Sequence, residues 1–80
     1  MGAVSPVIEV SKVVSEDPWS TEKLYEIVTP DEYAFEAFDK LVEAFENAGY
    51  VCSDHGSASV QLCVGRGEKL LIKVVMEGGN

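Results

Sequence analysis

The side chains best suited to chemistry or binding in this chain are five acids that recur every three or four residues after Asp31. That spacing places side chains on one face of an α-helix, where roughly 100° per residue confines the five to an arc of about 80°. We call them the acidic ridge: Glu32, Glu36, Asp39, Glu43 and Glu46. Each like-charged pair at this spacing costs the helix roughly 0.2–0.5 kcal/mol, so the alignment invites a functional explanation.

A second set of side chains lies on the opposite side of the same predicted helix. These side chains are apolar and recur with the same spacing: Phe35, Phe38, Leu41, Val42 and Phe45. A helix of this kind buries its apolar side against a core and leaves its charged side in water. Lys40 is the only base near the ridge. We therefore expect the carboxylates to face solvent with little compensation.

The acidic ridge does not meet the requirements of an enzyme or of a calcium site. Acid–base catalysis needs two carboxylates in different environments, whereas the ridge carboxylates share one solvated setting. A convex row of carboxylates also cannot surround a Ca²⁺ ion as a looped site does. We expect no catalytic residues and no cofactor, and instead contact between the ridge and a basic surface on another protein.

A second candidate for chemistry is the pattern Cys52, His55 and Cys63, to which Asp54 adds a possible fourth ligand. Structural zinc sites are usually built from two paired knuckles, and only one is present here. Neither of the pairing registers that suit a 50–64 hairpin places the two cysteines opposite each other, which argues against a disulfide. We expect no metal site and two free thiols, which suit a reducing compartment.

The charge balance excludes several classes of partner. The 80 residues include fourteen acids, six bases and one histidine, for a net charge of −8. Nucleic-acid binding depends on clustered Lys and Arg, and the only such cluster is Arg66, Lys69 and Lys73, so direct binding of nucleic acid is disfavoured. No apolar run approaches the roughly 18–20 residues that a membrane span needs. The segment Met1–Pro6 lacks the features of a secretory signal, so we expect a cytoplasmic protein.

We expect residues 1–80 to form one small domain, and its first half contains one ambiguous segment. Residues 6–14 are rich in β-branched side chains and predict a strand, and residues 15–21 predict a loop. Residues 22–28 fit a strand with Tyr25 and Ile27 on one face, or a short helix with Leu24, Ile27 and Val28 together. The Thr29-Pro30 step that follows favours the strand, because the residue before a proline avoids helical geometry.

The boundaries of the central helix have their own sequence signals. Thr29 followed by Pro30 and by Glu32 three residues later predicts a capping box at the start of the helix. Gly49 predicts a left-handed residue that ends it.

The remaining residues predict strands over 50–53 and 58–64 and a third that ends near Met76, with a frayed tail over 77–80. Gly65-Arg66-Gly67-Glu68 predicts a hairpin with a three-residue connection and a positive φ at Gly67. In that register the inward pairs are Val64 with Leu70, Leu62 with Ile72, Val60 with Val74 and Ala58 with Met76.

These elements predict an α+β fold: an antiparallel sheet of four to five strands, in the order β-β-α-β-β-β, with one long amphipathic helix packed on one face. The acidic ridge then points into water. On the second face of the sheet, Leu71 and Val75 alternate with Lys73 beside Cys63. We expect this face to be either exposed or covered by a partner, including a second copy of the chain.

Our leading hypothesis is a small acidic, non-enzymatic protein-binding module that acts as an inhibitor or adaptor. The ridge would dock on a basic surface, including one that otherwise binds nucleic acid, and apolar residues such as Trp19, Tyr33, Leu71 or Val75 would add lasting affinity. The alternative is a homo-oligomeric structural or small-ligand-binding module that assembles through the second sheet face. In that case the ridge serves only solubility.

Overall fold

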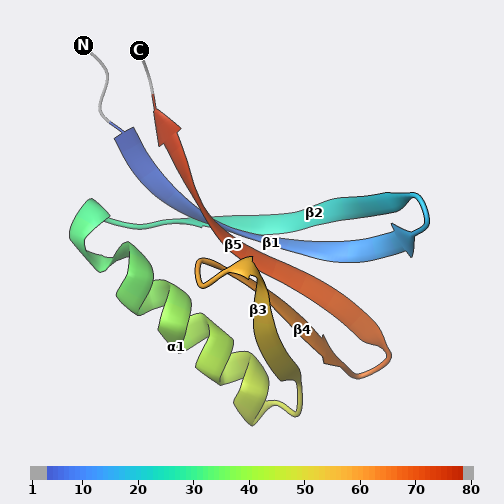
Figure 1. Cartoon of the computed structure of the whole chain (residues 1–80). Coiled ribbons are helices and arrows are strands. Elements are labelled where there is room, and N and C mark those ends of the chain that lie inside the picture. The colour runs from blue at the N-terminus through green and yellow to red at the C-terminus, as the bar shows by residue number, and fades with distance from the viewer. Residues whose placement is uncertain (1–3, 79–80) are drawn as a thin grey trace.

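The structure, a computed structural model, describes residues 4–78 and consists of one sheet and one helix. The five strands are β1 (Val4–Glu16), β2 (Trp19–Val28), β3 (Val51–Ser57), β4 (Val60–Gly65) and β5 (Glu68–Gly78). A 3₁₀ turn, η1 (Asp31–Tyr33), leads into the helix α1 (Ala34–Asn47). All neighbouring strands are antiparallel, in the spatial order β2-β1-β5-β4-β3 (Figure 1). The predicted fold class is confirmed.

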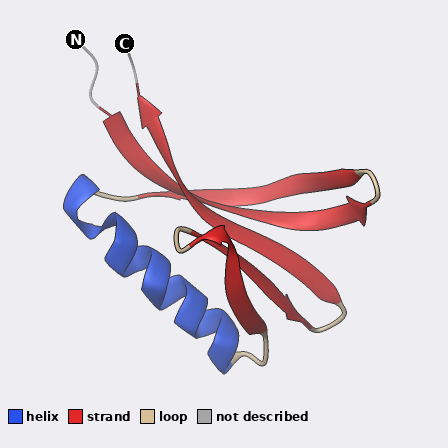
Figure 2. Cartoon of the chain, viewed as in Figure 1, coloured by secondary structure: helices blue, strands red, loops and turns tan. Residues whose placement is uncertain are grey.

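The helix covers one face of the sheet and packs against β1, β3, β4 and β5. A helix is about 10 Å wide, whereas strands lie about 4.8 Å apart, so one helix cannot cover five strands. The β1–β2 hairpin accordingly projects beyond the helix (Figures 1 and 2). All ten residues of β2 are exposed. The segment 22–28, which the sequence left open between strand and helix, is therefore part of an exposed edge strand.

The core lies between α1 and the central strands. Its buried members come from β1, β4, β5, the helix and the residue that precedes β3: Ile8, Val10, Phe38, Tyr50, Cys63, Leu70 and Ile72. Leu41, Val42 and Phe45 of the helix pack against this cluster, as the apolar spacing predicts. Phe35 does not join them, since it is 59% exposed.

The loop predicted over residues 15–21 is wrong, because most of it is strand. Ser15 pairs with Ser20 and Glu16 pairs with Trp19, which leaves only Asp17 and Pro18 in the turn, joined by a cis peptide bond. A hairpin that extends beyond the helix has no core to face. Polar residues can therefore continue its strands. The polar composition that suggested a loop does not distinguish a loop from an exposed strand.

The predicted capping box at Thr29 is also wrong. The Thr29 amide donates to the carbonyl of Pro6 at 3.4 Å, which holds this residue at the end of the sheet. Its hydroxyl is buried and has no hydrogen-bond partner among the described residues. The chain turns one step later, through η1, where the Tyr33 amide donates to the Pro30 carbonyl at 3.0 Å. The helix begins at Ala34 without a side-chain cap.

The end of the helix follows the prediction. Gly49 has a φ of 104°, and its amide donates to the Glu46 carbonyl at 3.0 Å. The Tyr50 amide donates to the Phe45 carbonyl at 3.0 Å, and the two rings meet edge to face with centroids 5.2 Å apart. This pair of bonds with its apolar contact is the Schellman motif.

The predicted register of the β4–β5 hairpin is wrong by one residue. The turn has two residues, Arg66 and Gly67, with φ of 53° and 77°, and Gly65 pairs with Glu68. Two consecutive positive φ values are the geometry that joins twisted strands most tightly. The positive φ predicted at Gly67 is confirmed, but the predicted connection missed the one at Arg66.

The shift reverses the two faces of β4. Cys63 pairs with Leu70 and faces the helix, whereas Leu62 pairs with Leu71 on the other face. A slip of one residue moves every side chain of a strand to the opposite face. The predicted inward set Val60, Leu62 and Val64 therefore points away from the helix. The predicted tail is also shorter, because β5 continues to Gly78, and residues 79–80 lie outside the described range.

Tyr50 packs directly over Gly65 on the neighbouring strand. A Cβ atom added at Gly65 would lie 2.9 Å from the Tyr50 Cα and 3.0 Å from two ring carbons. The Tyr50 hydroxyl donates to Glu68 Oε2 at 2.5 Å. Tyr50 thus links the end of the helix to the β4–β5 hairpin. Only a glycine at position 65 leaves room for the backbone and ring of Tyr50.

We expect Gly65→Ala to lower the free energy of unfolding by about 1–3 kcal/mol, because the added methyl group overlaps backbone as well as ring atoms. Urea denaturation measures the change. The same substitution in a Tyr50→Ala background is the control, and its penalty should shrink because the ring contacts are gone. An equal penalty in both backgrounds would contradict the packing described here.

The hydrogen bond to Glu68, followed by burial and by the charge of Glu68, raises the pKa of Tyr50 above its usual value of 10.0. Folding therefore stabilises the neutral phenol. That contribution is present below the unfolded pKa and is lost as the pH rises through the folded pKa. Unfolding free energies measured between about pH 8 and pH 11 should fall less steeply above about pH 10 in Tyr50→Phe than in the parent protein. Identical slopes would show that Tyr50 titrates as in the unfolded chain.

Candidate functional site

The five carboxylates of the acidic ridge lie on the outward side of η1 and α1. All five residues are exposed, and the buried helix residues Ala34 and Phe38 lie on the opposite side. Among the described residues one ion pair involves the ridge: Lys40 Nζ lies 3.9 Å from Glu36 Oε2, with both side chains more than half exposed. Such a surface pair contributes about 0–1 kcal/mol, so it neutralises little of the ridge.

Phe35 adds an apolar side chain to this surface, which the apolar spacing of the sequence did not indicate. It precedes Asp39 by four residues and follows Glu32 by three, the spacing of neighbours on a helix surface. Ala34 takes the buried position beside Phe38 that the spacing had offered to Phe35. Tyr33 is also exposed. The outward side of the helix therefore combines carboxylates with the ring of Phe35, and the exposed ring of Tyr33 lies in the preceding η1 turn.

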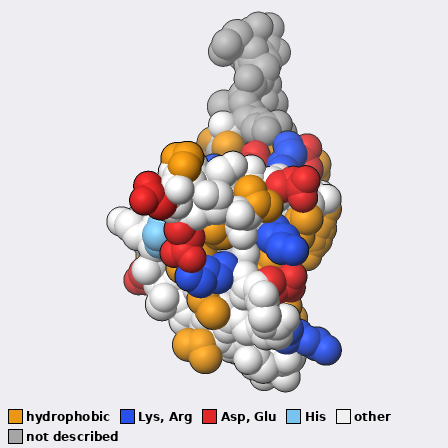
Figure 3. Space-filling model, turned by 90° about the vertical axis from the view of Figure 1, so that its right-hand side faces the viewer, with side chains coloured by type: hydrophobic (Ala, Val, Ile, Leu, Met, Phe, Trp, Pro, Cys, Tyr) orange, Lys and Arg blue, Asp and Glu red, His pale blue; other side chains and the backbone are white. Residues whose placement is uncertain are grey.

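The bases of the strands do not compensate the ridge. In the described part of the chain their ion pairs are with acids of other strand residues: Lys23 with Glu26 at 3.0 Å, Lys73 with Glu9 at 3.8 Å, and Lys69 with Glu16. On the side of the molecule toward the β1–β2 hairpin, acidic and basic side chains alternate with apolar ones (Figure 3). The last turn of α1 contains no base. Negative charge is therefore concentrated along the helix.

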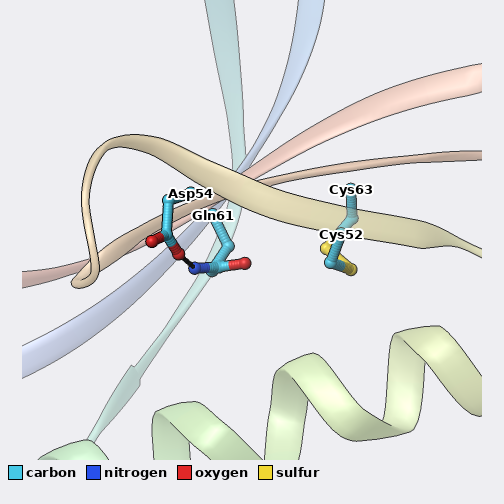
Figure 4. The surroundings of a disulfide bond; sticks show 4 residues. All are labelled: Cys52, Asp54, Gln61 and Cys63. Atoms are coloured by element: carbon cyan, nitrogen blue, oxygen red, sulfur yellow. Dashed lines mark hydrogen bonds between the residues drawn. A yellow bond between two sulfur atoms is a disulfide. The ribbon is translucent and has the colours of Figure 1, made fainter.

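The predicted absence of a disulfide is wrong. Cys52 and Cys63 are directly paired residues of β3 and β4, with Cα atoms 4.0 Å apart, and their sulfurs are bonded (Figure 4). On the same face, the Gln61 amide donates to the Asp54 carboxylate. The sequence pattern predicted that the strand ends at Ser53. The strand in fact continues to Ser57, with Gly56 at a φ of 92° in an irregular stretch, and this sets the register that joins the cysteines.

The disulfide changes what Cys52, His55 and Cys63 can do. Zinc is bound by thiolates, and neither sulfur is available as one. His55 instead stacks on Trp19, with ring centroids 5.5 Å apart and planes inclined by 15°. This contact joins the two strands at opposite edges of the sheet, β2 and β3. Across the described residues, no three His, Cys, Asp or Glu side chains converge as metal ligands.

One hollow on the described surface, bordered by β1 and the β4–β5 hairpin, is small and lies away from the ridge. Its volume is about 260 Å³, below the range of about 300–1,000 Å³ typical of small-molecule sites. Lys12, Val13, Glu68 and Lys69 are among its lining residues. The hollow contains no ridge residue and no buried catalytic pair.

Comparison of the chain with protein-family models, curated proteins and solved structures gives no match. Function is therefore inferred from the geometry. Between residues 4 and 78, α1 is too short and too polar to span a bilayer. The predicted cytoplasmic location loses its support from the cysteines, because these form a disulfide, and it stays a prediction.

Replacing both cysteines, Cys52→Ser with Cys63→Ser, should lower the free energy of unfolding by about 3 kcal/mol, because the bond closes a short loop in the unfolded chain. Urea denaturation with and without dithiothreitol measures the effect. Reductant should destabilise the parent protein by a similar amount and leave the double variant unchanged. Two reactive thiols in the native, unreduced protein would contradict the bond.

Proposed function

We propose that this protein is a small, non-enzymatic binding module whose acidic ridge docks on a basic surface of another protein. The observation that supports this proposal is the outward side of α1, where five exposed carboxylates form a row and an exposed phenylalanine lies beside two of them, Glu32 and Asp39. In this role the protein acts as an inhibitor or adaptor. A basic surface that otherwise receives nucleic acid is one that a row of carboxylates would match in charge.

The two kinds of side chain on this surface have different roles. Opposite charges increase the rate of encounter and orient the partners, and their contribution weakens as salt screens them. Buried aromatic contacts supply most of the lasting affinity in protein interfaces. Phe35 and Tyr33 fill that role here. Of the anchors suggested by the sequence, Leu71 is only 9% exposed and Trp19 stacks on His55, so neither is as available.

The alternative is a homo-oligomeric module assembled through the second sheet face, with the ridge serving only solubility. The apolar residues expected on this sheet face are less exposed to solvent than the sequence suggested. Leu71 is buried, Val75 is half-buried, and the ion pair of Lys73 with Glu9 crosses the same face. The exposed side of the helix therefore offers the stronger case for a partner surface.

Charge reversal on the ridge tests the proposal. The triple variant Glu36→Lys, Asp39→Lys and Glu43→Lys should keep the fold, because all three side chains are exposed, and should weaken capture of the partner at least about tenfold. The matched control reverses Glu16, Asp17 and Glu22, which are also exposed acids and lie in the β1–β2 hairpin. Both variants change the net charge equally, so a loss confined to the ridge variant assigns binding to the helix.

The measurement is a pull-down from native extract at low and high salt, followed by a titration of the captured partner against each variant. Capture by the parent protein should decrease with salt. Phe35→Ala should weaken binding without changing its salt dependence, because it removes an apolar contact and no charge. Capture that is unchanged in the ridge variant, or lost equally in the control, would discard the proposal.

A further inference from the structure

The strand β2 is the most exposed regular element of the fold. It pairs with β1 alone among the described strands, so the amides and carbonyls of its outer edge lack a strand partner. Natural edge strands are usually short, or are interrupted by proline or several lysines. This one has ten residues, contains no proline and carries one lysine.

Apolar side chains along β2 are exposed as well. Leu24 is 50% exposed and Val28 is 71% exposed, and Tyr25 and Ile27 also lie in the open. The cause is the limited width of α1, whose described packing is with β1, β3, β4 and β5. An extended edge with this composition is a template for pairing with another strand.

The charged residues of β2 favour a second copy of β2 as the pairing strand, and they favour one register of that pairing. An irregularity in the pairing with β1 beside Leu24 brings Lys23 and Glu26 onto one side of the strand, where they form the 3.0 Å ion pair. When two copies of β2 run antiparallel about a twofold axis between Leu24 and Tyr25, Lys23 of each copy lies opposite Glu26 of the other. Leu24 of each copy then lies opposite Tyr25 of the other. Both pairings are favourable cross-strand pairs.

The neighbouring registers are unfavourable. With the axis at Leu24, Glu22 faces Glu26 of the second copy and the like charges repel. With the axis at Tyr25, Leu24 faces Glu26 and Lys23 faces Ile27. The register with the axis between Leu24 and Tyr25 therefore pairs Lys23 with Glu26 and Leu24 with Tyr25 twice, as the symmetry of an interface between identical chains requires, and it also places Glu22 opposite Ile27.

We propose that β2 is a dimerisation edge, at which a second copy of this chain continues the sheet to ten strands through antiparallel β2–β2 pairing. The contact area is small, so the dimer should be weak, with dissociation in the micromolar range or above. The acidic ridges lie on helices that do not take part. The proposal is therefore independent of the proposed function, and both activities can coexist in one molecule.

The response to salt distinguishes dimerisation through β2 from binding of a basic partner by the acidic ridge. Each copy has a net charge of −8, so long-range repulsion opposes dimerisation at low ionic strength, and the exposed cross-strand ion pairs offset little of it. Dimerisation should therefore strengthen with added salt, whereas binding of a basic partner by the ridge should weaken.

Sedimentation velocity over a wide range of protein concentrations, with charge-exchange variants, tests the proposal. Lys23→Glu places four acids together in the dimer and should reduce the association constant at least about fivefold. The double variant Lys23→Glu with Glu26→Lys restores opposite charges across the edge and should return the constant to within about twofold of the parent. Lys40→Glu on the helix is the matched control and should change it by less than about twofold.

Circular dichroism of each variant establishes that the monomer remains folded. Slower amide exchange in β2 at high protein concentration would locate the contact directly. A protein that stays monomeric at every concentration, a double variant that fails to recover, or an equal loss in Lys40→Glu would overturn the proposal.

Discussion

The fold depends on one constraint: a single helix must cover the apolar face of a five-stranded sheet. Its side chains Phe38, Leu41 and Phe45 meet the central strands, and the Schellman motif at Gly49 returns the chain to the sheet at Tyr50. The helix reaches four strands and leaves β2 uncovered. The exposed edge strand and the outward carboxylates are both consequences of this arrangement, since each lies where the helix provides no cover.

Periodicity predicted the elements that interact with the core. The helix, its end at Gly49 and the alternation of β5 follow from apolar spacing and from glycine chemistry, and they are present. Features that depend on long-range pairing could not be derived in this way. The Thr29 signal for a helix start is overridden by a backbone bond to Pro6, a contact between segments more than twenty residues apart that local propensity does not contain.

The candidate site was predicted in part. The spacing of the acids indicated a common outward face, and all five ridge residues are exposed. The prediction that Phe35 faces the core is wrong because the apolar side of the helix is wider than the part that packs on the sheet. The small side chain of Ala34 takes the position nearest the core. The disulfide was missed because its register depends on how far β3 continues before the turn. The irregular stretch between Asp54 and Ser57 shifts the pairing by two residues, and this shift decides whether Cys52 lies opposite Cys63. The amino-acid composition does not mark where such a shift occurs.

In the proposed function, the outward side of α1 is the surface that receives a basic partner. The most direct measurement is a nuclear magnetic resonance titration of the labelled protein with the partner that it captures. We expect the amide shifts to concentrate in η1 and α1, around Phe35 and the ridge, and to diminish as salt is raised. Shifts confined to the strands, with the helix unaffected, would contradict this role of α1.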